Sequence, residues 1–187
     1  MANSIYFERA LPRSWMLAGI LILQPAMAKE PTMQASPSQA QTISLGKGHF
    51  VVEFDPSVES YQLTSVVIPG QCTPRLSLQE EGDGLAVKRE SDDCKADTYA
   101  KLRLNPTWAS DLHLSLSAGQ LDLQPTLLSQ VGKLVAAVKV GDIIGHRDVK
   151  RSWLLGANLS LENGTGTAVR ATVGAGQITL VSASVSP

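Results

Sequence analysis

Hydrophobic and polar residues alternate one by one along most of the chain from residue 42 onward. The clearest examples, residues 75–79, 98–104 and 112–116, carry apolar side chains at every second position, and Gly, Pro or Asp follows each within a few residues. A period of two that is bounded by turn-forming residues is typical of β-strands with one buried face. The pattern therefore predicts a single all-β domain over residues 42–187.

The second half of this domain contains a weak repeat built on glycine. Three steps share the order glycine, polar residue, apolar residue: Gly119-Gln120-Leu121, Gly141-Asp142-Ile143 and Gly176-Gln177-Ile178. Gly119, Gly141 and Gly164 follow one another at intervals of 22 and 23 residues, and a period in the twenties indicates stacked structural repeats. We predict that Gly119, Gly141, Gly164 and Gly176 form structural turns, because glycine permits corners that other residues resist.

Two architectures fit these features. The favoured one is a short β-solenoid or β-roll of stacked, glycine-turned rungs over residues 106–182, preceded by an N-terminal β-hairpin region over residues 42–105. The alternative is an antiparallel β-sandwich whose hairpins turn at the same glycines.

The first 28 residues follow a different pattern. Arg9 and Arg13 precede an unbroken apolar run over residues 15–23, and Ala26-Met27-Ala28 supplies small residues on either side of a methionine. This order is typical of a removable signal peptide, and the run is much shorter than the ~20 residues that a membrane anchor needs. We predict cleavage after Ala28, then a flexible leader over residues 29–41, and export to the periplasm, the cell surface or the medium.

Charge and cysteine content narrow the classes of function. The chain carries 16 Lys and Arg against 17 Asp and Glu and has no basic stripe, which argues against nucleic-acid binding. Its two cysteines, Cys72 and Cys94, lack the Cys-x-x-Cys spacing of a redox pair, and cysteines of exported proteins usually pair with each other. We predict a structural disulfide, with a redox pair or metal ligands as the alternative.

The glycine steps also carry a resemblance to a known family. Residues 112–121, 138–143 and 173–180 are similar to the repeats of the bacterial "putative adhesin" family of short β-solenoid domains, whose function is unassigned. The similarity spans residues 84–182, and Gln120 and Gln177 occupy positions where that family commonly has Asp. This resemblance implies the solenoid fold and an adhesin-like role.

Candidate chemistry is sparse along the chain. Asp142, His146 and Asp148 are weak candidates for metal ligands, and we favour a water-facing polar corner as their explanation. No serine lies in a nucleophile elbow, and no glycine-rich segment has the spacing of a phosphate-binding loop. Trp108 and Trp153 lie outside the alternating segments, as candidates for a binding surface or as caps on the open ends of the core.

These observations predict an exported, non-enzymatic envelope protein without a cofactor, either adhesin-like or a scaffold for protein interactions. Its expected partner is an envelope protein or a surface glycan, not nucleic acid, and no segment beyond residue 28 is apolar enough to span a membrane. Two alternatives remain open. One is a periplasmic carbohydrate-active or metal-dependent enzyme, and the other is an accessory protein of envelope stress or signalling.

Overall fold

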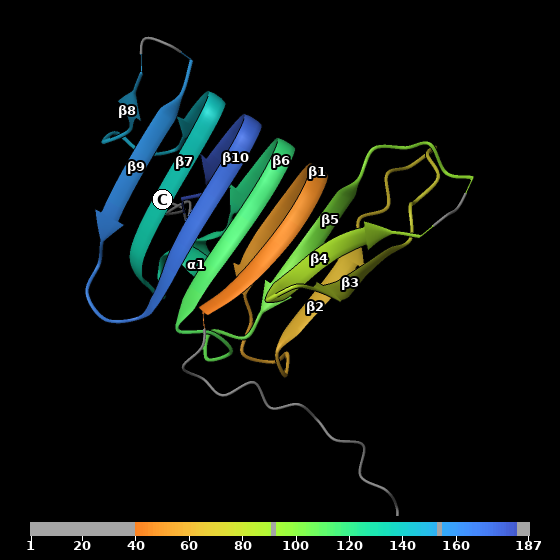
Figure 1. Ribbon diagram of the computed structural model, residues 1–187, viewed down its shortest axis with the longest axis horizontal. Coiled ribbons are helices and arrows are strands. Elements are labelled where there is room, and N and C mark those ends of the chain that lie inside the picture. The colour runs from red at the N-terminus through yellow and green to blue at the C-terminus, as the bar shows by residue number, and fades with distance from the viewer. Residues whose placement is uncertain (1–39, 91–92, 153–154, 183–187) are drawn as a thin grey trace, which may run out of the picture. The chain divides into compact units, whose positions relative to one another are not determined.

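The computed structural model describes residues 40–90, 93–152 and 155–182, which all belong to the unit Gln34–Pro187. These residues form ten strands and one short helix (Figure 1), so the predicted all-β class is confirmed. The elements are β1 (Ala40–Phe54), β2 (Tyr61–Ser65), β3 (Leu76–Glu81), β4 (Gly84–Arg89), β5 (Tyr99–Leu104), β6 (Asp111–Leu123), α1 (Pro125–Leu128), β7 (Val131–Ile144), β8 (Lys150–Arg151), β9 (Ala157–Glu162) and β10 (Thr167–Leu180). The predicted signal peptide, residues 29–39 of the predicted leader, and Trp153 lie outside the described residues.

All ten strands belong to one mixed sheet, in the order β2-β5-β1-β6-β10-β7-β9-β8, with β4 also paired to β1 and β3 to β4. The four longest strands, β1, β6, β10 and β7, lie side by side and are parallel to one another (Figure 1). Antiparallel pairs flank this centre: β2 with β5, β3 with β4, and β9 with both β7 and β8. No described helix is long and apolar enough to cross a membrane.

The order of the central strands differs from a stack of successive repeats. The last strand, β10, lies between β6 and β7, so β6 and β7 are not neighbours although they follow each other along the chain. The parallel centre also differs from the antiparallel pairing that a sandwich of hairpins requires. Alternation along one strand shows which face is buried, but it carries no information about the strand beside it.

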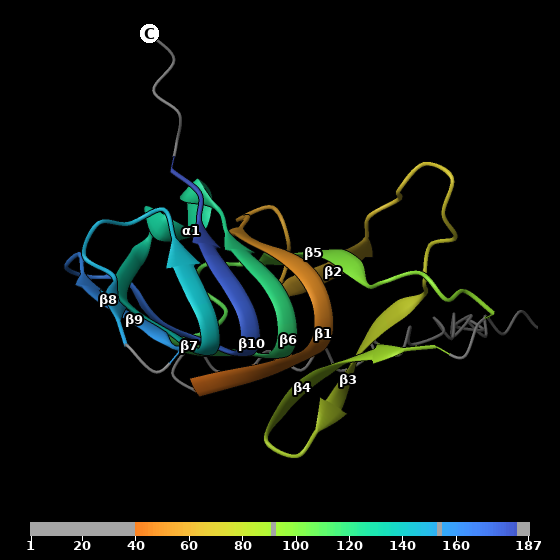
Figure 2. The ribbon, with the colours of Figure 1, turned by 90° about the horizontal axis from the view of Figure 1, so that it is seen from above.

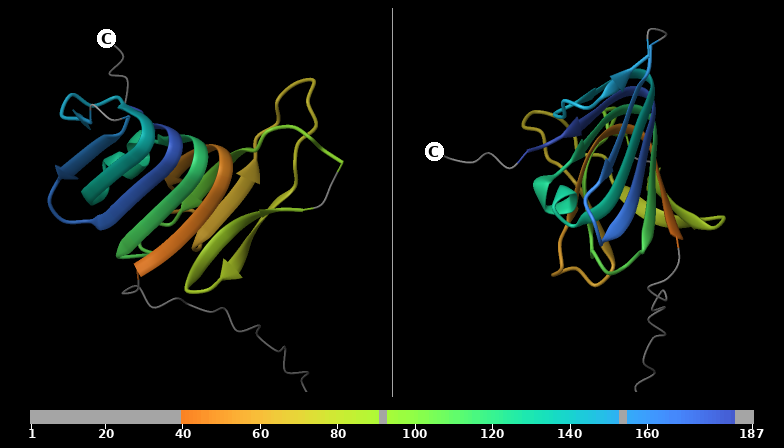
Figure 3. Two further views of the ribbon diagram at one scale, coloured as in Figure 1. Left: turned by 45° about the horizontal axis from the view of Figure 1, so that its top comes forward. Right: turned by 90° about the vertical axis from the view of Figure 1, so that its left-hand side faces the viewer.

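Each long strand buries two sets of alternating residues that are out of phase. In β6 the buried residues are even-numbered before Gly119 and odd-numbered after it: Leu112, Leu114, Leu116, Leu121 and Leu123. The strand therefore turns at the glycine, and both halves contribute to one core. β1, β7 and β10 change phase in the same way, and Figures 2 and 3 show all four ribbons curving. Among the described residues no polar or charged residue is buried, so this core is apolar.

The change of phase occurs at glycines that share one register. Gly48, Gly119, Gly176 and Gly141 are aligned across β1, β6, β10 and β7, with φ angles between 128° and 141°. We call these four residues the glycine ladder. A Cβ on Gly119 would lie 1.9 Å from the carbonyl oxygen of Gly48, and one on Gly176 would lie 1.8 Å from that of Gly119. Side chains are excluded there both by the backbone conformation and by the close approach of the next strand.

The first member of the glycine ladder is Gly48, and the predicted turn residue Gly164 is not part of it. Gly164 lies in the loop between β9 and β10, where no atom is within 4 Å of the place that its Cβ would take. Its spacing from Gly141 matched the repeat, but β9 turns back antiparallel along β7 and adds no parallel strand. β1 also begins slightly before the predicted domain start, and Ala40 already pairs with Asp111 of β6.

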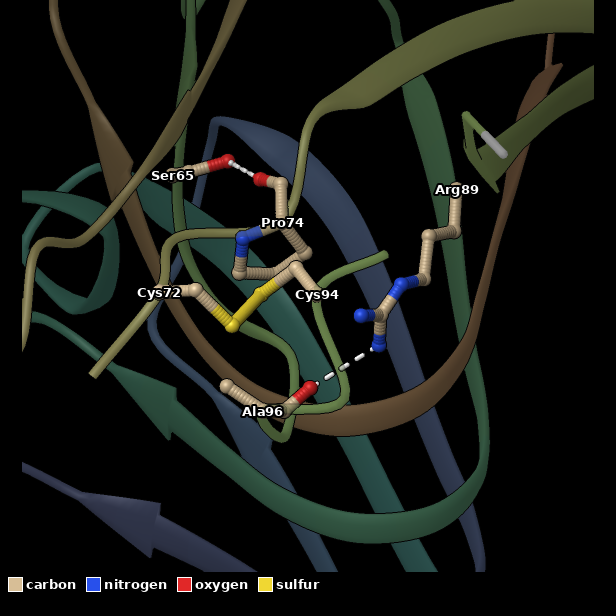
Figure 4. The surroundings of a disulfide bond; sticks show 6 residues. All are labelled: Ser65, Cys72, Pro74, Arg89, Cys94 and Ala96. Atoms are coloured by element: carbon tan, nitrogen blue, oxygen red, sulfur yellow. Dashed lines mark hydrogen bonds between the residues drawn. A yellow bond between two sulfur atoms is a disulfide. The ribbon is translucent and has the colours of Figure 1, made fainter. Parts of the chain in front are cut away.

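Cys72 and Cys94 form a disulfide, as predicted (Figure 4). The bond joins the segment between β2 and β3 to the segment between β4 and β5. Two further bonds hold these segments in place: the Ser65 hydroxyl donates to the carbonyl of Pro74 at 2.7 Å, and the Arg89 guanidinium donates to the carbonyl of Ala96 at 2.8 Å. The disulfide thus constrains the irregular chain on both sides of the β3–β4 hairpin.

Candidate functional site

Polar side chains form a continuous row immediately after the glycine ladder. The residue that follows each ladder glycine points away from the core at the same register on four neighbouring strands, and β5 continues the line. This polar row consists of Tyr99, His49, Gln120, Gln177 and Asp142, all partly exposed. Neighbouring strands lie about 4.8 Å apart, so the row is about 19 Å long. The part of each strand that follows its ladder glycine has one face on the core and one face away from it. We call the face away from the core, which carries the polar row, the outer face.

His49 connects two strands within the polar row and its surroundings. Its Nε2 donates to Oδ2 of Asp122 at 2.6 Å, and its ring stacks on that of Tyr99 with the centroids 4.4 Å apart. The side-chain amide of Gln120 donates to the other carboxylate oxygen of Asp122 at 2.8 Å. Two donors from neighbouring strands therefore fix the Asp122 carboxylate, and the carboxylate in turn fixes both donors.

The polar row keeps hydrogen-bonding capacity for a ligand. Gln177 repeats the arrangement of Gln120 one strand further on, since its amide nitrogen donates to the hydroxyl of Thr179 at 2.9 Å. Within the described residues, no group donates to the amide oxygen of either glutamine. An amide has two N–H donors and one oxygen acceptor, so each glutamine retains at least one group of each kind.

Charged groups on the outer face are neutralised by close partners. Lys101 and Arg103 share the carboxylate of Glu53, Arg151 pairs with Asp142, and the His49 ring bonds to Asp122, with nitrogen–oxygen distances between 2.6 and 3.1 Å. Three cationic side chains, Lys101, Arg103 and Arg151, thus meet three carboxylates, those of Glu53, Asp122 and Asp142. Exposed ion pairs of this kind contribute little to stability, about 0–1 kcal/mol each. Their consequence for the site is electrostatic, because they leave the outer face without an excess of either sign.

The Asp142 end of the polar row lies at an open edge of the sheet. β9 pairs with the first half of β7 only, so residues 141–144 have a sheet neighbour on one side alone. On the open side, the backbone groups of these residues bond within the same chain. The N–H of Gly141 donates to the carbonyl of Leu155 at 2.8 Å. The N–H of Ile143 donates to the Asp142 carboxylate at 2.8 Å, and Arg151 donates to the carbonyl of Ile143 at 3.3 Å. Such bonds cap an edge that would otherwise invite another strand.

Asp142 contributes to this cap as a charged group. The hydrogen bond from Arg151 is the main reason that the pKa of Asp142 is below its ordinary value. Partial burial opposes this effect, whereas the backbone N–H of Ile143 and the positive charge of Arg151 lower the pKa further. Asp142 is therefore ionised at neutral pH. Its carboxylate already accepts hydrogen bonds from Arg151 and from the N–H of Ile143.

The three candidate metal ligands do not come together. Asp142 accepts a hydrogen bond from Arg151 at 2.8 Å, whereas His146 and Asp148 lie near each other in the turn after β7. These residues are close in sequence, but β7 ends at Ile144, between Asp142 and the other two. Among the described residues, no three His, Cys, Asp or Glu side chains lie close enough to share a metal ion.

Trp108 is half-buried and packs against the core. Its ring meets that of Tyr61 edge-on, with the centroids 5.3 Å apart, which agrees better with capping the core than with an exposed binding anchor. Exposed large apolar side chains include Tyr61 beside Trp108, and Val140, Ile144 and Leu155 at the open edge of β7. A binding role for Trp108 stays a prediction.

A histidine paired with a carboxylate can act as a general base, but hydrolysis also requires a nucleophile or a positioned water. No described serine, threonine or cysteine hydrogen-bonds to His49, and both cysteines belong to the disulfide. The imidazole and its carboxylate therefore orient each other on an open surface, an arrangement suited to hydrogen-bonding a ligand.

An open hollow beside the β3–β4 turn is a further candidate for an enzymatic cleft. It is lined by Thr42 and Ser44 of β1 and by the acidic side chains of Glu81 and Asp83. Both carboxylates are exposed, and Glu81 pairs with Lys88 at 2.7 Å. A glycosidase needs one carboxyl group that stays protonated in a desolvated site, and this hollow provides no such burial.

Five residues of the site were not predicted as functional from the sequence: His49, Tyr99, Gln120, Asp122 and Gln177. The step Gly48-His49-Phe50 has the same order of glycine, polar residue and apolar residue as the three repeats, so the pattern itself contained this signal. Asp122 follows Gln120 by two positions and lies on the same face of β6. The contact between His49 and Asp122 spans 73 positions and depends on the pairing of β1 with β6, which alternation does not determine.

Comparison with known proteins gives little further guidance. No family model matches the chain, and no curated protein matches its sequence. Among solved structures it is similar to a "putative cell adhesion protein" from Clostridium sporogenes, with a TM-score of 0.34 and 6% sequence identity over 77% of this chain and 93% of that chain. A likeness at this level assigns neither a family nor a function.

Proposed function

We propose that the protein is an exported, non-enzymatic recognition domain that binds an envelope partner through its outer face, in an adhesin-like or scaffolding role. The polar row carries this proposal, because five side chains stand in register on one face of five parallel strands, and two of them, Gln120 and Gln177, retain free donors and acceptors. The glycine ladder and the apolar core hold the strands in place before a ligand arrives. A preorganised surface loses less conformational freedom on binding, which favours affinity.

Two features support export. The sequence begins with the basic, apolar and small-residue segments of a signal peptide, and the folded domain contains a disulfide. Disulfides persist mainly in oxidising compartments such as the periplasm and the cell exterior. Both features support export to the periplasm, the cell surface or the medium.

The same proposal includes the finer assignment of the fold. The four parallel strands that turn at the glycine ladder support a β-roll, in which each long strand is one bent rung and both of its halves enclose the core. Pairing of β4 with the first half of β1 and of β5 with its second half extends the two halves separately.

Binding to isolated envelopes tests the proposed function. Purified protein is labelled with a fluorophore and mixed with envelope fragments of the producing cells, and bound protein is measured after sedimentation. We expect saturable binding by the wild type and a loss of at least about tenfold in affinity, ~1.4 kcal/mol, for the double variant Gln120→Ala/Gln177→Ala. Both glutamines are partly exposed and outside the core, so the fold is expected to persist.

The matched control is Ser115→Ala/Thr172→Ala. These residues lie on the same two strands at one register, and they also point away from the core, but they precede the glycine ladder. The control is expected to bind as the wild type does. Absence of saturable binding by the wild type, or equal losses in the two double variants, would refute the outer face as the recognition surface.

A further inference from the structure

We infer that the outer face binds a neutral polysaccharide, which lies across the strands along the polar row. The inference rests on the proposed recognition function and adds the chemical class of the ligand. It is drawn from the hydrogen-bonding groups, the charge balance and the spacing of the outer face.

The hydrogen-bonding groups of the polar row suit hydroxyl groups. Gln120 and Gln177 each offer a free donor and a free acceptor side by side, and the phenol of Tyr99 can both donate and accept. A sugar hydroxyl likewise donates and accepts, so two adjacent hydroxyls can pair with one amide group. Asp122 holds the amide of Gln120 in position, which makes this arrangement ready for a ligand.

The charge balance argues against a charged polymer. A polyanion such as nucleic acid is recognised through unpaired lysine and arginine, and its binding weakens steeply with salt. On the outer face the cationic groups of Lys101, Arg103 and Arg151 each lie within 3.1 Å of a carboxylate oxygen. A neutral ligand displaces none of these pairs and requires no excess charge.

The apolar content of the outer face is small and scattered. Val51 and Ile144 are outward residues one step beyond the polar row, in the line Lys101, Val51, Asp122, Thr179 and Ile144. Protein interfaces usually centre on aromatic or arginine anchors that become fully buried, whereas Tyr99 already stacks on His49. Isolated aliphatic side chains between polar groups instead suit the small apolar faces of sugar rings.

The spacing of the polar row suits an extended chain. Its side chains recur about every 4.8 Å across parallel strands, a distance close to the length of one sugar unit. A row of about 19 Å can therefore contact about four consecutive units. A polysaccharide whose consecutive units face the same way would present equivalent hydroxyls to successive strands, as Gln120 and Gln177 are equivalent on β6 and β10.

Calorimetric titration of the purified protein tests this inference. The probes are soluble neutral oligosaccharides, namely maltohexaose, cellohexaose, chitohexaose and short dextran, and polygalacturonate serves as an anionic comparison. We expect at least one neutral probe to bind with an affinity that is the same at low and at high salt. Gln120→Ala/Gln177→Ala is expected to weaken this binding at least tenfold, while Ser115→Ala/Thr172→Ala leaves it unchanged and both variants keep the melting temperature of the wild type.

The outcomes separate this inference from the proposed function. If no neutral probe binds, or if polygalacturonate alone binds and salt abolishes its binding, the inference is overturned. If Gln120→Ala/Gln177→Ala nevertheless loses its binding to envelopes, the recognition function stands with a partner of another class. If the variant binds envelopes as the wild type does, the function and the inference both fail.

Discussion

The glycine ladder sets the geometry of the site one residue at a time. In the four long strands, the residue that follows each ladder glycine is the one that points outward in the polar row. The carbonyl oxygen of each glycine lies where a Cβ on the next strand would have to be, as for Gly48 against Gly119. A side chain at the ladder therefore forces neighbouring strands apart and shifts the polar row with them.

Gly119→Ala is expected to destabilise the domain strongly. Its φ of 128° is unfavourable for alanine, a cost of about 1–3 kcal/mol, and the new Cβ would lie 1.9 Å from the carbonyl oxygen of Gly48. Urea unfolding followed by circular dichroism measures the change in the free energy of unfolding. Gly164→Ala is the control, because Gly164 also has a positive φ of 105° but open space around its Cβ position. Equal losses in the two variants would contradict the tight packing of the ladder.

The pKa of Asp142 provides a second test at the residue scale. Removing the guanidinium in Arg151→Gln is expected to raise the pKa of Asp142 toward its ordinary value, because the main cause of its lowering is lost. Carboxyl titration by NMR measures this shift, and Asp148, which lies beyond the end of β7, serves as an internal reference. An unchanged pKa of Asp142 would show that Arg151 does not hold this carboxylate in solution.

The sign of the accompanying effect on stability follows from linkage. Because the pKa of Asp142 is lowered in the folded state, its contribution favours folding above the pKa of the unfolded chain and is lost as the pH falls through the folded value. The contribution of Asp142 to stability therefore changes with pH only in the acidic range. At neutral pH the Asp142–Arg151 pair stays fully charged.

Part of the fold and of the site could be predicted from single positions in the sequence. Alternation identified the buried leucines of β6, and three of the four ladder glycines were selected as turns. The chemistry of the site was harder to predict, because His49 becomes significant only when β1 places it beside Gln120 and near Asp122. The step Gly48-His49-Phe50 marks the outward position of His49, but the contact with Asp122 on another strand leaves no local signal.

At the scale of elements, the open half of β7 shows how the fold protects its own edge. Asp142 and Arg151 bond to the backbone of Ile143 from the two sides of a turn, and Leu155 accepts from Gly141. Without these bonds the edge would present free N–H and C=O groups next to the exposed side chains of Val140 and Ile144. Exposed, apolar edges of this kind are sites of strand addition and aggregation.

Removing the cap is expected to promote self-association. Asp142→Ala/Arg151→Ala frees the backbone of Ile143, so light scattering and sedimentation should reveal oligomers that the wild type does not form at the same concentration. The control is Lys133→Ala/Glu162→Ala, which removes an exposed ion pair between β7 and β9 where β7 is already paired on both sides. If both variants stay monomeric, the cap is not what keeps the edge closed.

The prediction of elements succeeded where it depended on one strand and failed where it depended on two. Strands were expected over residues 98–104 and 112–116, and β5 and β6 occupy these segments. The insertion of β10 between β6 and β7 could not be derived, since Val169 of β10 alternates in the same way whichever neighbour it has. The capping role of Arg151 could not be predicted either, because it depends on how the chain after β7 turns back toward Asp142 and Ile143.

At the scale of the whole molecule, the described residues offer an outer face that continues across five neighbouring strands. The core is apolar, the charged groups of the outer face are paired, and the polar groups with free capacity are aligned on one face. Enzymes enclose their substrates to exclude water, whereas recognition domains present preformed surfaces. This distribution is the physical basis for the proposed recognition function.

The three histidines of the chain make a direct test possible. His49, His113 and His146 have similarly exposed side chains, at 33%, 35% and 30%. His49 lies in the polar row, His113 points outward from β6 before the glycine ladder, and His146 lies in the turn after β7. Because each histidine is compared with itself in the free and bound states, a change in its labelling reports whether a partner covers that part of the surface.

The most direct measurement is histidine labelling with diethyl pyrocarbonate, read by mass spectrometry, with and without bound envelope fragments. The account predicts that binding protects His49 while His113 and His146 remain as reactive as in the free protein. Unchanged labelling of His49 under saturating binding, or protection of His113 or His146 in its place, would contradict the outer face as the recognition surface.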